Sequence, residues 1–510
     1  MIYQGLLPEI TLPLDFTLGE IQESVISTEK ATPGLVKWCC QDATNQPTEA
    51  ARMKLSRQQV QRKTHALPNL RFEDQQLTSF AGLFLFQSLF QRLDLKQRLR
   101  DAFRHLHSSR AYDHGLAVLS LVVHLLLGYR QLRDSRYYSD DPMVQRVLGL
   151  DRLPDVATMS RLLASTDTRS VGETRQLNRQ TVQDRLVVLG LRRVTLDFDG
   201  SVIGTGRYAE GTAVGFNRLK KGQRSYYPLF CTVAQTGQVF DVHHRPGNVH
   251  DSNGAKEFIL ACVEHMRQAL PGVVIEVRMD GAFFSDALVT LLTQLGVEFT
   301  ISVPFERFVE LKSKIEKRQQ WKRIGAGLDY FELRWKPQAW DRRYRFLFVR
   351  SRVVIRDKGP VQLDLFVPQL DGHEFKVVVT NKKIRAQEVI AYHNGRGAQE
   401  GVFAELKSQG QMDYVPTKTL TGNQIFLLSA VLAHNLNREL QMVANEPSRK
   451  TTAQRSPLWR FERLETLRRK LIQRAGRFTL PQGRLTLTMS ANPAVREELL
   501  HYSQVLKRAA

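Results

Sequence analysis

Cysteine is scarce in this sequence: four occur among 510 residues, and no two of them are spaced as a C-x-x-C pair. Cys39 and Cys40 are adjacent, so they cannot readily bridge each other. Cys231 and Cys262 stand in apolar stretches, where core packing explains them. The sequence therefore excludes a disulfide framework and predicts a protein of a reducing compartment.

Long apolar runs are also missing. The longest, residues 115–128, contains His124 and is too short to cross a bilayer, so it is predicted to form a buried helix. The opening residues, MIYQGLLPEI, lack the charged and apolar regions of a signal peptide. We therefore expect a cytoplasmic protein.

Acidic residues are too few to balance the basic ones. The chain has 51 Asp and Glu against 73 Lys and Arg, which gives a net charge of +22 and an isoelectric point near 10.0. Such an excess suits a polyanionic partner. Nucleic acid is favoured over a membrane, because no polybasic amphipathic segment or lipid-anchor motif occurs. Basic ribosomal or chaperone-like proteins share this property, so charge alone leaves them open.

Hydrophobic periodicity divides the chain into six segments. Helical spacing prevails between residues 66 and 185, where Asp155 is expected to cap a helix. Such a helical domain suits DNA binding, and a purely structural role explains it nearly as well. The expected segments are an irregular N-terminal extension (1–65), a helical DNA-binding domain (66–185), the first part of a catalytic core (186–305), an inserted β subdomain (306–370), the second part of the core (371–445) and a basic C-terminal region (446–510).

From Arg193 onward the pattern changes to that of strands. Three consecutive strands, the last two joined by a turn at Thr236 and Gly237, precede alternating helices and strands. This order predicts an α/β fold with a mixed five-stranded sheet and one antiparallel edge. It matches the ribonuclease-H-like order of elements.

The expected β subdomain at residues 306–370 is rich in aromatic residues and arginine. Trp321, Trp335 and Trp340 lie in it. One interpretation is that they stack on a flipped base or on a flanking strand. Core packing explains each of the three better.

Two aspartates stand where metal-assisted phosphodiester chemistry needs them. Asp199 lies in the first strand of the core, Asp280 ends a later strand, and a glycine follows each. The order of elements indicates that these strands are neighbours, which would bring the carboxylates together. Such chemistry uses two divalent cations roughly 3.5–4 Å apart. Mg²⁺ prefers hard oxygen ligands, and Mn²⁺ is expected to substitute. Asp197 shares a strand face with Asp199 and remains an alternative first ligand.

A third carboxylate is expected on a helix that begins near Ala398. At about 100° per residue, Arg396, Glu400 and Lys407 fall within roughly 40° of one another. Alone, this pattern is typical of a surface ladder of ion pairs. After two strand-borne aspartates in the right order, it favours Glu400 as the third acid of the site. Glu405 projects roughly opposite Arg396 and is expected to be solvated or structural, and comparatively tolerant of replacement.

A histidine-rich segment offers a competing metal site with His243, His244, His250 and Asp251. Zinc is disfavoured there, because the segment contains a Pro-Gly turn and has no cysteine partner.

Eight short stretches follow one another from residue 77 to residue 478. They are LTSFAGL, LDFDGSVIGTGRYAEG, GQRSYYPL, HRPGNVHD, RMDGAFFS, NGRGAQEGVFAELK, GNQIFLLSAVLAHNLNREL and LETLRRKLIQRAGRF. Together they resemble the DDE transposases of bacterial insertion sequences, in the branch with a Tyr-Arg-Glu-Lys signature around the third acid. The sequence is most similar to the insertion-sequence thirteen-eighty group.

The resemblance implies roles for six residues. Those implied as catalytic metal ligands are Asp199, Asp280 and Glu400, and those implied to contact DNA near the cut are Tyr392, Arg396 and Lys407. Tyr392 departs from the pattern, since it stands four residues before Arg396 and the group has three.

The resemblance also implies an activity. It is that of a prokaryotic, nucleoid-associated transposase with two Mg²⁺ ions per active site, which binds the terminal inverted repeats of its element and target DNA. It would cleave and join strands by cut and paste, as a homodimer in a synaptic complex, and a hairpin intermediate is left open. Two alternatives remain: a ribonuclease-H-like nuclease without strand transfer, and a non-catalytic DNA-binding protein derived from a transposase.

Overall fold

The computed structural model describes residues 69–73, 75–107, 112–215, 217, 220–250, 253–304, 308–325, 327–352, 369–370, 372–449 and 458–508. The expected N-terminal extension lies outside these residues, as do Cys39, Cys40 and Asp251. Glu73–Ala510 group as one compact unit. Within the described ranges, no helix is both long and apolar enough to cross a membrane.

Helices dominate the chain before the sheet, as their spacing predicts. Asp155 caps α6, because its carboxylate accepts a hydrogen bond from the Thr158 backbone N–H at 2.7 Å. α4 is buried along nearly its whole length, which confirms the prediction of a buried helix. The bounds are α2 (Phe84–Arg92), α3 (Leu95–Phe103), α4 (His114–Leu127), α5 (Pro142–Leu148), α6 (Val156–Ala164) and α7 (Thr168–Leu189).

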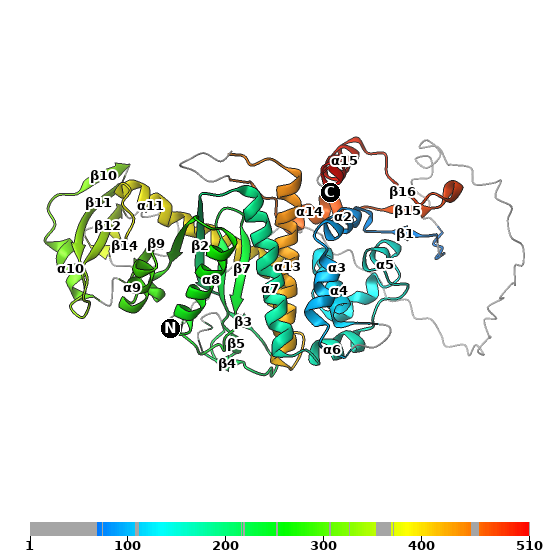
Figure 1. The fold of residues 1–510 in the computed structure, drawn as a ribbon, viewed down its shortest axis with the longest axis horizontal. Helices are drawn as coiled ribbons and strands as arrows, with labels where there is room; N and C mark the ends of the chain where they lie inside the picture. Colours follow the sequence, from blue (N-terminus) through cyan, green and yellow to red (C-terminus); the bar gives the residue numbers. More distant parts are fainter. Residues whose placement is uncertain are drawn as a thin grey trace, which may run out of the picture. The chain divides into compact units, whose positions relative to one another are not determined.

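One large mixed sheet follows, with the strand order β10-β11-β12-β14-β9-β8-β2-β6-β7 (Figure 1). β2, β6 and β7 pair antiparallel, as the predicted meander requires, whereas β8 is parallel to both β2 and β9. The α/β class with a mixed sheet is therefore confirmed. The bounds are β2 (Arg193–Gly200), β6 (Leu229–Val233), β7 (Gln238–His243), β8 (Val274–Met279), β9 (Glu298–Val303) and β14 (His373–Thr380).

Between β2 and β6 the chain forms a small separate sheet. Its strands are β3 (Ile203–Gly204), β4 (Ala213–Val214) and β5 (Arg224–Tyr226), in the order β3-β5-β4. Both outer strands pair antiparallel with β5. These three short strands form the connection between β2 and β6 of the main sheet.

The expected inserted β subdomain is not a separate body. β10 (Lys322–Gly325), β11 (Leu328–Trp335) and β12 (Tyr344–Arg352) extend the main sheet, because β12 pairs along its length with β14. Buried Phe346 and Phe348 of β12 share a core with β8 and β9. The strands were predicted correctly, and they lengthen the main sheet beyond the five neighbouring strands β7-β6-β2-β8-β9.

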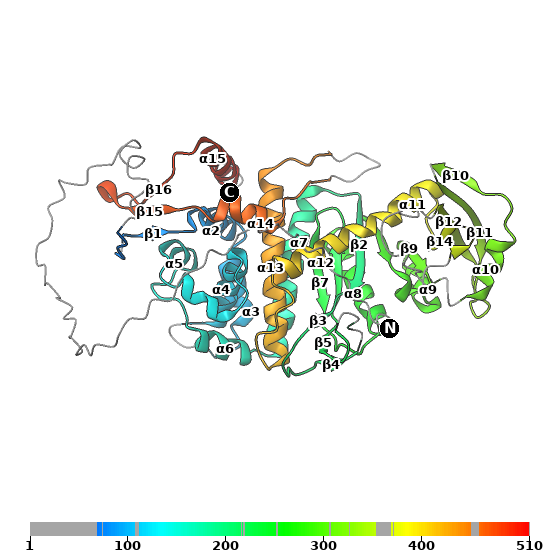
Figure 2. The same cartoon turned by 180° about the vertical axis from the view of Figure 1, so that it is seen from behind.

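Helices cover both faces of the sheet. α7, α8 (Ala255–Ala269) and α9 (Asp286–Gln294) pack on the face seen in Figure 1. α11 (Ala386–Asn394) and α12 (Ala398–Ser408) cross the opposite face, seen in Figure 2. The long helix α13 (Leu420–Ala444) contacts the edge strand β7 as well as α4 and α7. α13 therefore joins the sheet to the helical part.

The expected basic C-terminal region is built into the helical part instead of forming a region of its own. β15 (Gly476–Thr479) pairs with β1 (Leu77–Thr78) and with β16 (Thr486–Met489). α14 (Leu464–Leu467) leads into a π-helical turn, and α15 (Pro493–Arg508) packs on α2. In that turn, buried Arg468 donates hydrogen bonds to the carbonyls of Leu125 and Leu126 at the end of α4, at 2.9 and 2.7 Å. These bonds satisfy carbonyl groups that a helix end leaves without partners.

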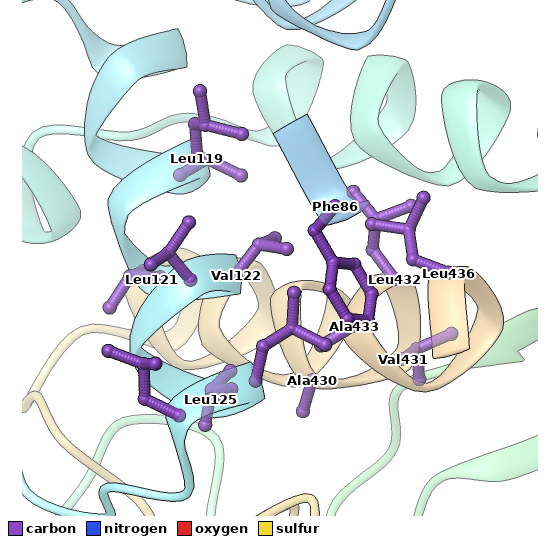
Figure 3. Close-up of a cluster of buried hydrophobic side chains, with 14 of the residues drawn as sticks. Phe86, Leu119, Leu121, Val122, Leu125, Ala430, Val431, Leu432, Ala433 and Leu436 are labelled. Atoms are coloured by element: carbon purple, nitrogen blue, oxygen red, sulfur yellow. The ribbon is translucent and has the colours of Figure 1, made fainter. Parts of the chain in front are cut away.

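Apolar side chains of α2, α4 and α13 interlock in the helical part (Figure 3). Phe86, Leu125 and Leu432 are fully buried there. Full burial of side chains of this size contributes about 1.5–3 kcal/mol each. The shared core explains why the helical part and the sheet form one unit.

Candidate active site

Asp199 and Asp280 stand side by side at the ends of two neighbouring strands. β2 and β8 are parallel, and their last paired residues, Phe198 and Met279, directly precede the two aspartates. The Asp199 carboxylate accepts a hydrogen bond from the next backbone N–H at 2.8 Å. The Asp280 carboxylate accepts a hydrogen bond from the Ala282 backbone N–H at 3.0 Å and so caps a short 3-10 turn. The adjacency of the two strands confirms what the order of elements predicts.

Asp197, the alternative first ligand, is held by Arg278. The guanidinium donates two hydrogen bonds to its carboxylate, at 2.6 and 2.7 Å, and a third to the Tyr392 carbonyl at 2.8 Å. Only 1% of Asp197 is exposed. The Gln399 side chain also donates to the Asp197 carbonyl at 3.0 Å. A carboxylate enclosed in this way is not available to a metal ion, so the structure favours Asp199 of the two.

Replacing Asp197 with Asn is therefore expected to reduce stability. The change leaves the buried Arg278 charge without its counter-ion, and hydrogen bonds between charged groups are worth about 1.5–3 kcal/mol each. We expect the free energy of unfolding to fall by about 2–3 kcal/mol, measured by chemical denaturation. Asp199→Asn, on the same strand face, is the matched control and should leave it nearly unchanged. Equal stability losses in the two variants would contradict this assignment.

The third acid lies on a helix that follows two closely spaced glycines. The 3-10 turn Gly395–Gly397 separates α11 from α12, and α12 begins at Ala398, as predicted. A Cβ atom at Gly395 would collide with Arg278 Nη1, so a larger residue there would have to displace the guanidinium from Asp197 and the Tyr392 carbonyl. The turn therefore packs directly against the Asp197–Arg278 pair.

Arg396 lies between two of the three carboxylates. Its Nη1 is 3.1 Å from Asp199 Oδ2, and its Nη2 is 3.9 Å from Glu400 Oε1. The Glu400 side chain is 70% exposed. Among the residues that the structure describes, no three His, Cys, Asp or Glu side chains converge on a point that could hold a metal ion. In this arrangement the positively charged Arg396 guanidinium forms an ion pair with the Asp199 carboxylate.

Tyr392 faces the interior of the fold. Its ring lies 4.3 Å from Lys382 Nζ and 5.1 Å from the centre of the Arg278 guanidinium. Its hydroxyl is buried beside Thr195, and this burial raises the pKa of Tyr392 well above its ordinary value. The arrangement does not support the expected contact between Tyr392 and DNA.

The other end of α12 carries Lys407 and Glu405. Lys407 is half-buried, and burial lowers the pKa of its ammonium group while nearby Asp413 opposes that shift. Glu405 is buried; its carboxylate lies 2.5 Å from Arg438 Nη2 and accepts a hydrogen bond from the Leu464 N–H at 3.0 Å. The expectation that Glu405 is solvated is therefore wrong, and the expectation that it is structural is confirmed. The expected tolerance of replacement conflicts with this buried ion pair.

The sequence matches the family described as transposase DDE domain, group 1, over residues 61–510. The chain belongs to this family. DDE transposases generally use divalent metal ions for catalysis. Among curated proteins there is no match.

Solved structures of other transposases show low similarity to this family member. One is the piggyBac transposase synaptic complex with hairpin DNA, at 11% identity and a TM-score of 0.39, with 84% of this chain and 81% of that chain covered. Another is the Mos1 transposase paired-end complex with left transposon end, at 12% identity and a TM-score of 0.16, with 38% of this chain and 60% of that chain covered.

The histidine segment of this DDE family member packs against aromatic rings. His243 stacks on Phe258 with ring centroids 5.7 Å apart, and His244 lies 4.3 Å from the Tyr226 ring. Burial lowers the pKa of His244 to about 3. These contacts give the two imidazoles a structural role.

The tryptophans of the extended sheet edge pack in the core. Trp335 and Trp340 are buried. Trp321 packs edge-on against Phe331, and the Arg350 guanidinium lies 4.5 Å from its ring centre. Core packing, the favoured explanation, is confirmed for Trp335 and Trp340, whereas Trp321 is half-buried against the same core.

Sequence reasoning missed the Asp197–Arg278 pair, although a signal for it exists. Arg278 stands two residues before Asp280, as Asp197 stands before Asp199. Parallel strands paired in register place the two residues opposite each other. A basic and an acidic residue at matching positions before two candidate ligands therefore indicate an ion pair beneath the site.

Proposed function

We propose that this chain is a DNA transposase that binds the ends of its element, cleaves DNA strands there and joins them to target DNA by cut and paste. The observation that carries the proposal is geometric: Asp199 and Asp280 end neighbouring parallel strands, and Arg396 links Asp199 to Glu400. Membership of the DDE family and the net charge of +22 support a DNA substrate.

The three carboxylates fit Mg²⁺, because all of them supply the hard oxygen ligands that this ion prefers. Two such ions per site, with Mn²⁺ as a substitute, would activate the attacking oxygen and stabilise the leaving one. For Glu400 to approach the aspartates, Arg396 has to release both carboxylates. The exposure of Glu400 leaves its side chain free to turn toward them.

Arg396 and Lys407 would then hold the phosphates of the strand to be cut. A guanidinium offers a planar pair of N–H donors that matches a phosphate, whereas an ammonium acts as a point charge. The Asp197–Arg278 pair and Gly395 would position the turn that carries Arg396. In this assignment Tyr392 supports the helix from within.

Variants of Arg396 and Lys407 test this division of roles. Arg396→Lys keeps the charge but loses the planar fork, and Lys407→Ala loses the charge at the far end of α12. We expect each to slow single-turnover cleavage roughly tenfold to a hundredfold with an unchanged melting temperature. If both only support the helix through exposed ion pairs, worth about 0.3–0.5 kcal/mol each, activity and stability should fall together.

The proposed activity implies the binding partners of this protein. They are the terminal inverted repeats of its own element, target DNA and a second copy of the chain in a synaptic complex. Its site of action would be the nucleoid in a prokaryotic cytoplasm, and its branch the insertion-sequence thirteen-eighty group with a ribonuclease-H-like core.

One experiment separates this function from its two rivals. Labelled duplexes that end in the inverted repeats flanking the gene are incubated with the protein, Mg²⁺ and a target plasmid. Joined products support a transposase, and cleavage without joining supports a hydrolytic nuclease. Binding that needs no metal and produces neither reaction supports a non-catalytic DNA-binding protein.

A further inference from the structure

Three arginine–tyrosine pairs gather where the helical part meets the far end of α12. The Arg130, Arg136 and Arg224 guanidinium groups lie 5.6, 4.8 and 5.4 Å from the ring centres of Tyr414, Tyr137 and Tyr208, respectively. Tyr137 is 62% exposed and Tyr208 is 68% exposed. Core packing therefore does not account for the positions of these two rings.

Two further arginines join the pairs into one surface. Exposed Arg133 and Arg207 both lower the pKa of Tyr414 electrostatically, although burial raises it more, so both lie near that ring. The name Arg–Tyr surface is used below for the three pairs together with Arg133 and Arg207. They come from three separate segments of the chain, at 130–137, 207–224 and 414.

Each acidic residue beside the Arg–Tyr surface has a hydrogen-bond or ion-pair partner. Asp413 pairs with Arg130 at 2.6 Å. Asp134 accepts a hydrogen bond from the Gln131 N–H at 2.8 Å, and Glu210 accepts one from the Leu420 N–H at 3.0 Å. Asp413 thus offsets the charge of Arg130, whereas Asp134 and Glu210 hold backbone groups. The other arginines dominate the charge of this surface.

The segments that carry the proposed catalytic acids both lead to this surface. The chain passes from Asp199 through β3 to Arg207, eight residues later. α12 runs from Glu400 to Lys407, a rise of roughly 10 Å. Lys407 lies near Asp413, which pairs with Arg130. Lys407, at the far end of α12 from Glu400, therefore lies close to the Arg–Tyr surface.

We propose that the Arg–Tyr surface binds the phosphate backbone of the DNA duplex that leads to the cleavage site. Hydrogen bonds to Tyr137 and Thr212 hold the stacked Arg136 and Arg224 in place. Exposed Arg133 and Arg207 present guanidinium groups, whose planar N–H donors match a phosphate in bidentate geometry. Because each of the tyrosine rings already has a guanidinium over it, backbone contact is favoured over stacking of unpaired bases. The proposal rests on the proposed function, since it assigns that duplex a route across the protein.

The test measures equilibrium binding of a labelled 30-base-pair duplex, and of a single strand of the same length, as a function of salt. The Arg133→Ala/Arg207→Ala variant should bind the duplex roughly tenfold more weakly, with a log–log salt slope shallower by about 1.8, or about 0.9 per lost phosphate contact. Arg342→Ala/Arg343→Ala removes two adjacent exposed arginines from the loop before β12. This matched control should leave the slope unchanged.

Each other outcome has a definite meaning. An unchanged slope in Arg133→Ala/Arg207→Ala, with a wild-type protein that binds and cleaves, would overturn the Arg–Tyr surface and leave the proposed function standing. A greater loss for the single strand than for the duplex would overturn the duplex assignment. Failure of the wild-type protein to bind either DNA would contradict the proposed function itself.

Discussion

Replacement of Asp199 or Asp280 by Asn, or of Glu400 by Gln, is expected to slow DNA strand cleavage by about a thousandfold or more. Metal ligation contributes several kcal/mol to the transition state, and about 4 kcal/mol corresponds to a thousandfold change in rate. The measurement is single-turnover cleavage of a labelled element end in Mg²⁺. Binding of the same duplex should change little, because these acids act chiefly after the DNA is bound.

The control for Glu400 is Glu388, which is also exposed and stands in the first turn of the neighbouring helix α11. Glu388→Gln should cleave at the wild-type rate, although it removes the same kind of charge from a matching position. Cleavage that persists in a triple variant of Asp199, Asp280 and Glu400 would refute the mechanism. Loss of cleavage in Asp197→Asn at unchanged stability would shift the first ligand to Asp197.

The strand ends that carry two of these acids could be predicted because local patterns determine them. β-branched runs end at Asp199 and Asp280, and the helix between their strands makes a parallel pairing the natural one. The start of α12 after Gly397 is likewise a local property of the sequence. Each of these features depends on residues close together in the chain.

Local sequence patterns could not predict which strands belong to the main sheet. Whether β12 joins the main sheet depends on its pairing with β14, where Arg345 lies opposite Thr380. Alternating apolar residues show that a strand forms and which face is buried, but they do not identify its neighbour. For the same reason, the sequence did not predict that residues 458–508 pack on the helical part.

Side-chain environments also depended on distant partners. A helical wheel places Arg396 and Glu400 on one face, yet it does not show that Arg396 reaches back to Asp199. Tyr392 extrapolates to the same face, but the turn at Gly395–Gly397 changes the path of the chain, and the tyrosine packs inward against Lys382. The sequence identified the site residues as candidates, and the structure distinguishes those at its surface from those beneath it.

Glu405→Ala is expected to destabilise the protein by about 3–5 kcal/mol, the usual cost of leaving one member of a buried ion pair without its partner. Arg438 would remain buried without its carboxylate, and the Leu464 N–H at the start of α14 would lose its acceptor. The measurement is the free energy of unfolding from chemical denaturation. Glu400→Ala, five residues earlier on the same helix, should leave this free energy within about 0.5 kcal/mol of wild type, since exposed ion pairs contribute little.

A double variant shows whether Glu405→Ala destabilises the protein because the ion pair is lost or because any replacement at this position does so. Glu405→Leu/Arg438→Met replaces both charges with apolar side chains of similar length, so it should recover much of the stability that Glu405→Ala loses. Recovery should be incomplete, because the Leu464 N–H still has no acceptor. If Glu405→Ala instead abolishes cleavage while unfolding at the wild-type denaturant concentration, Glu405 acts in catalysis. The assignment of the third metal ligand to Glu400 would then be wrong.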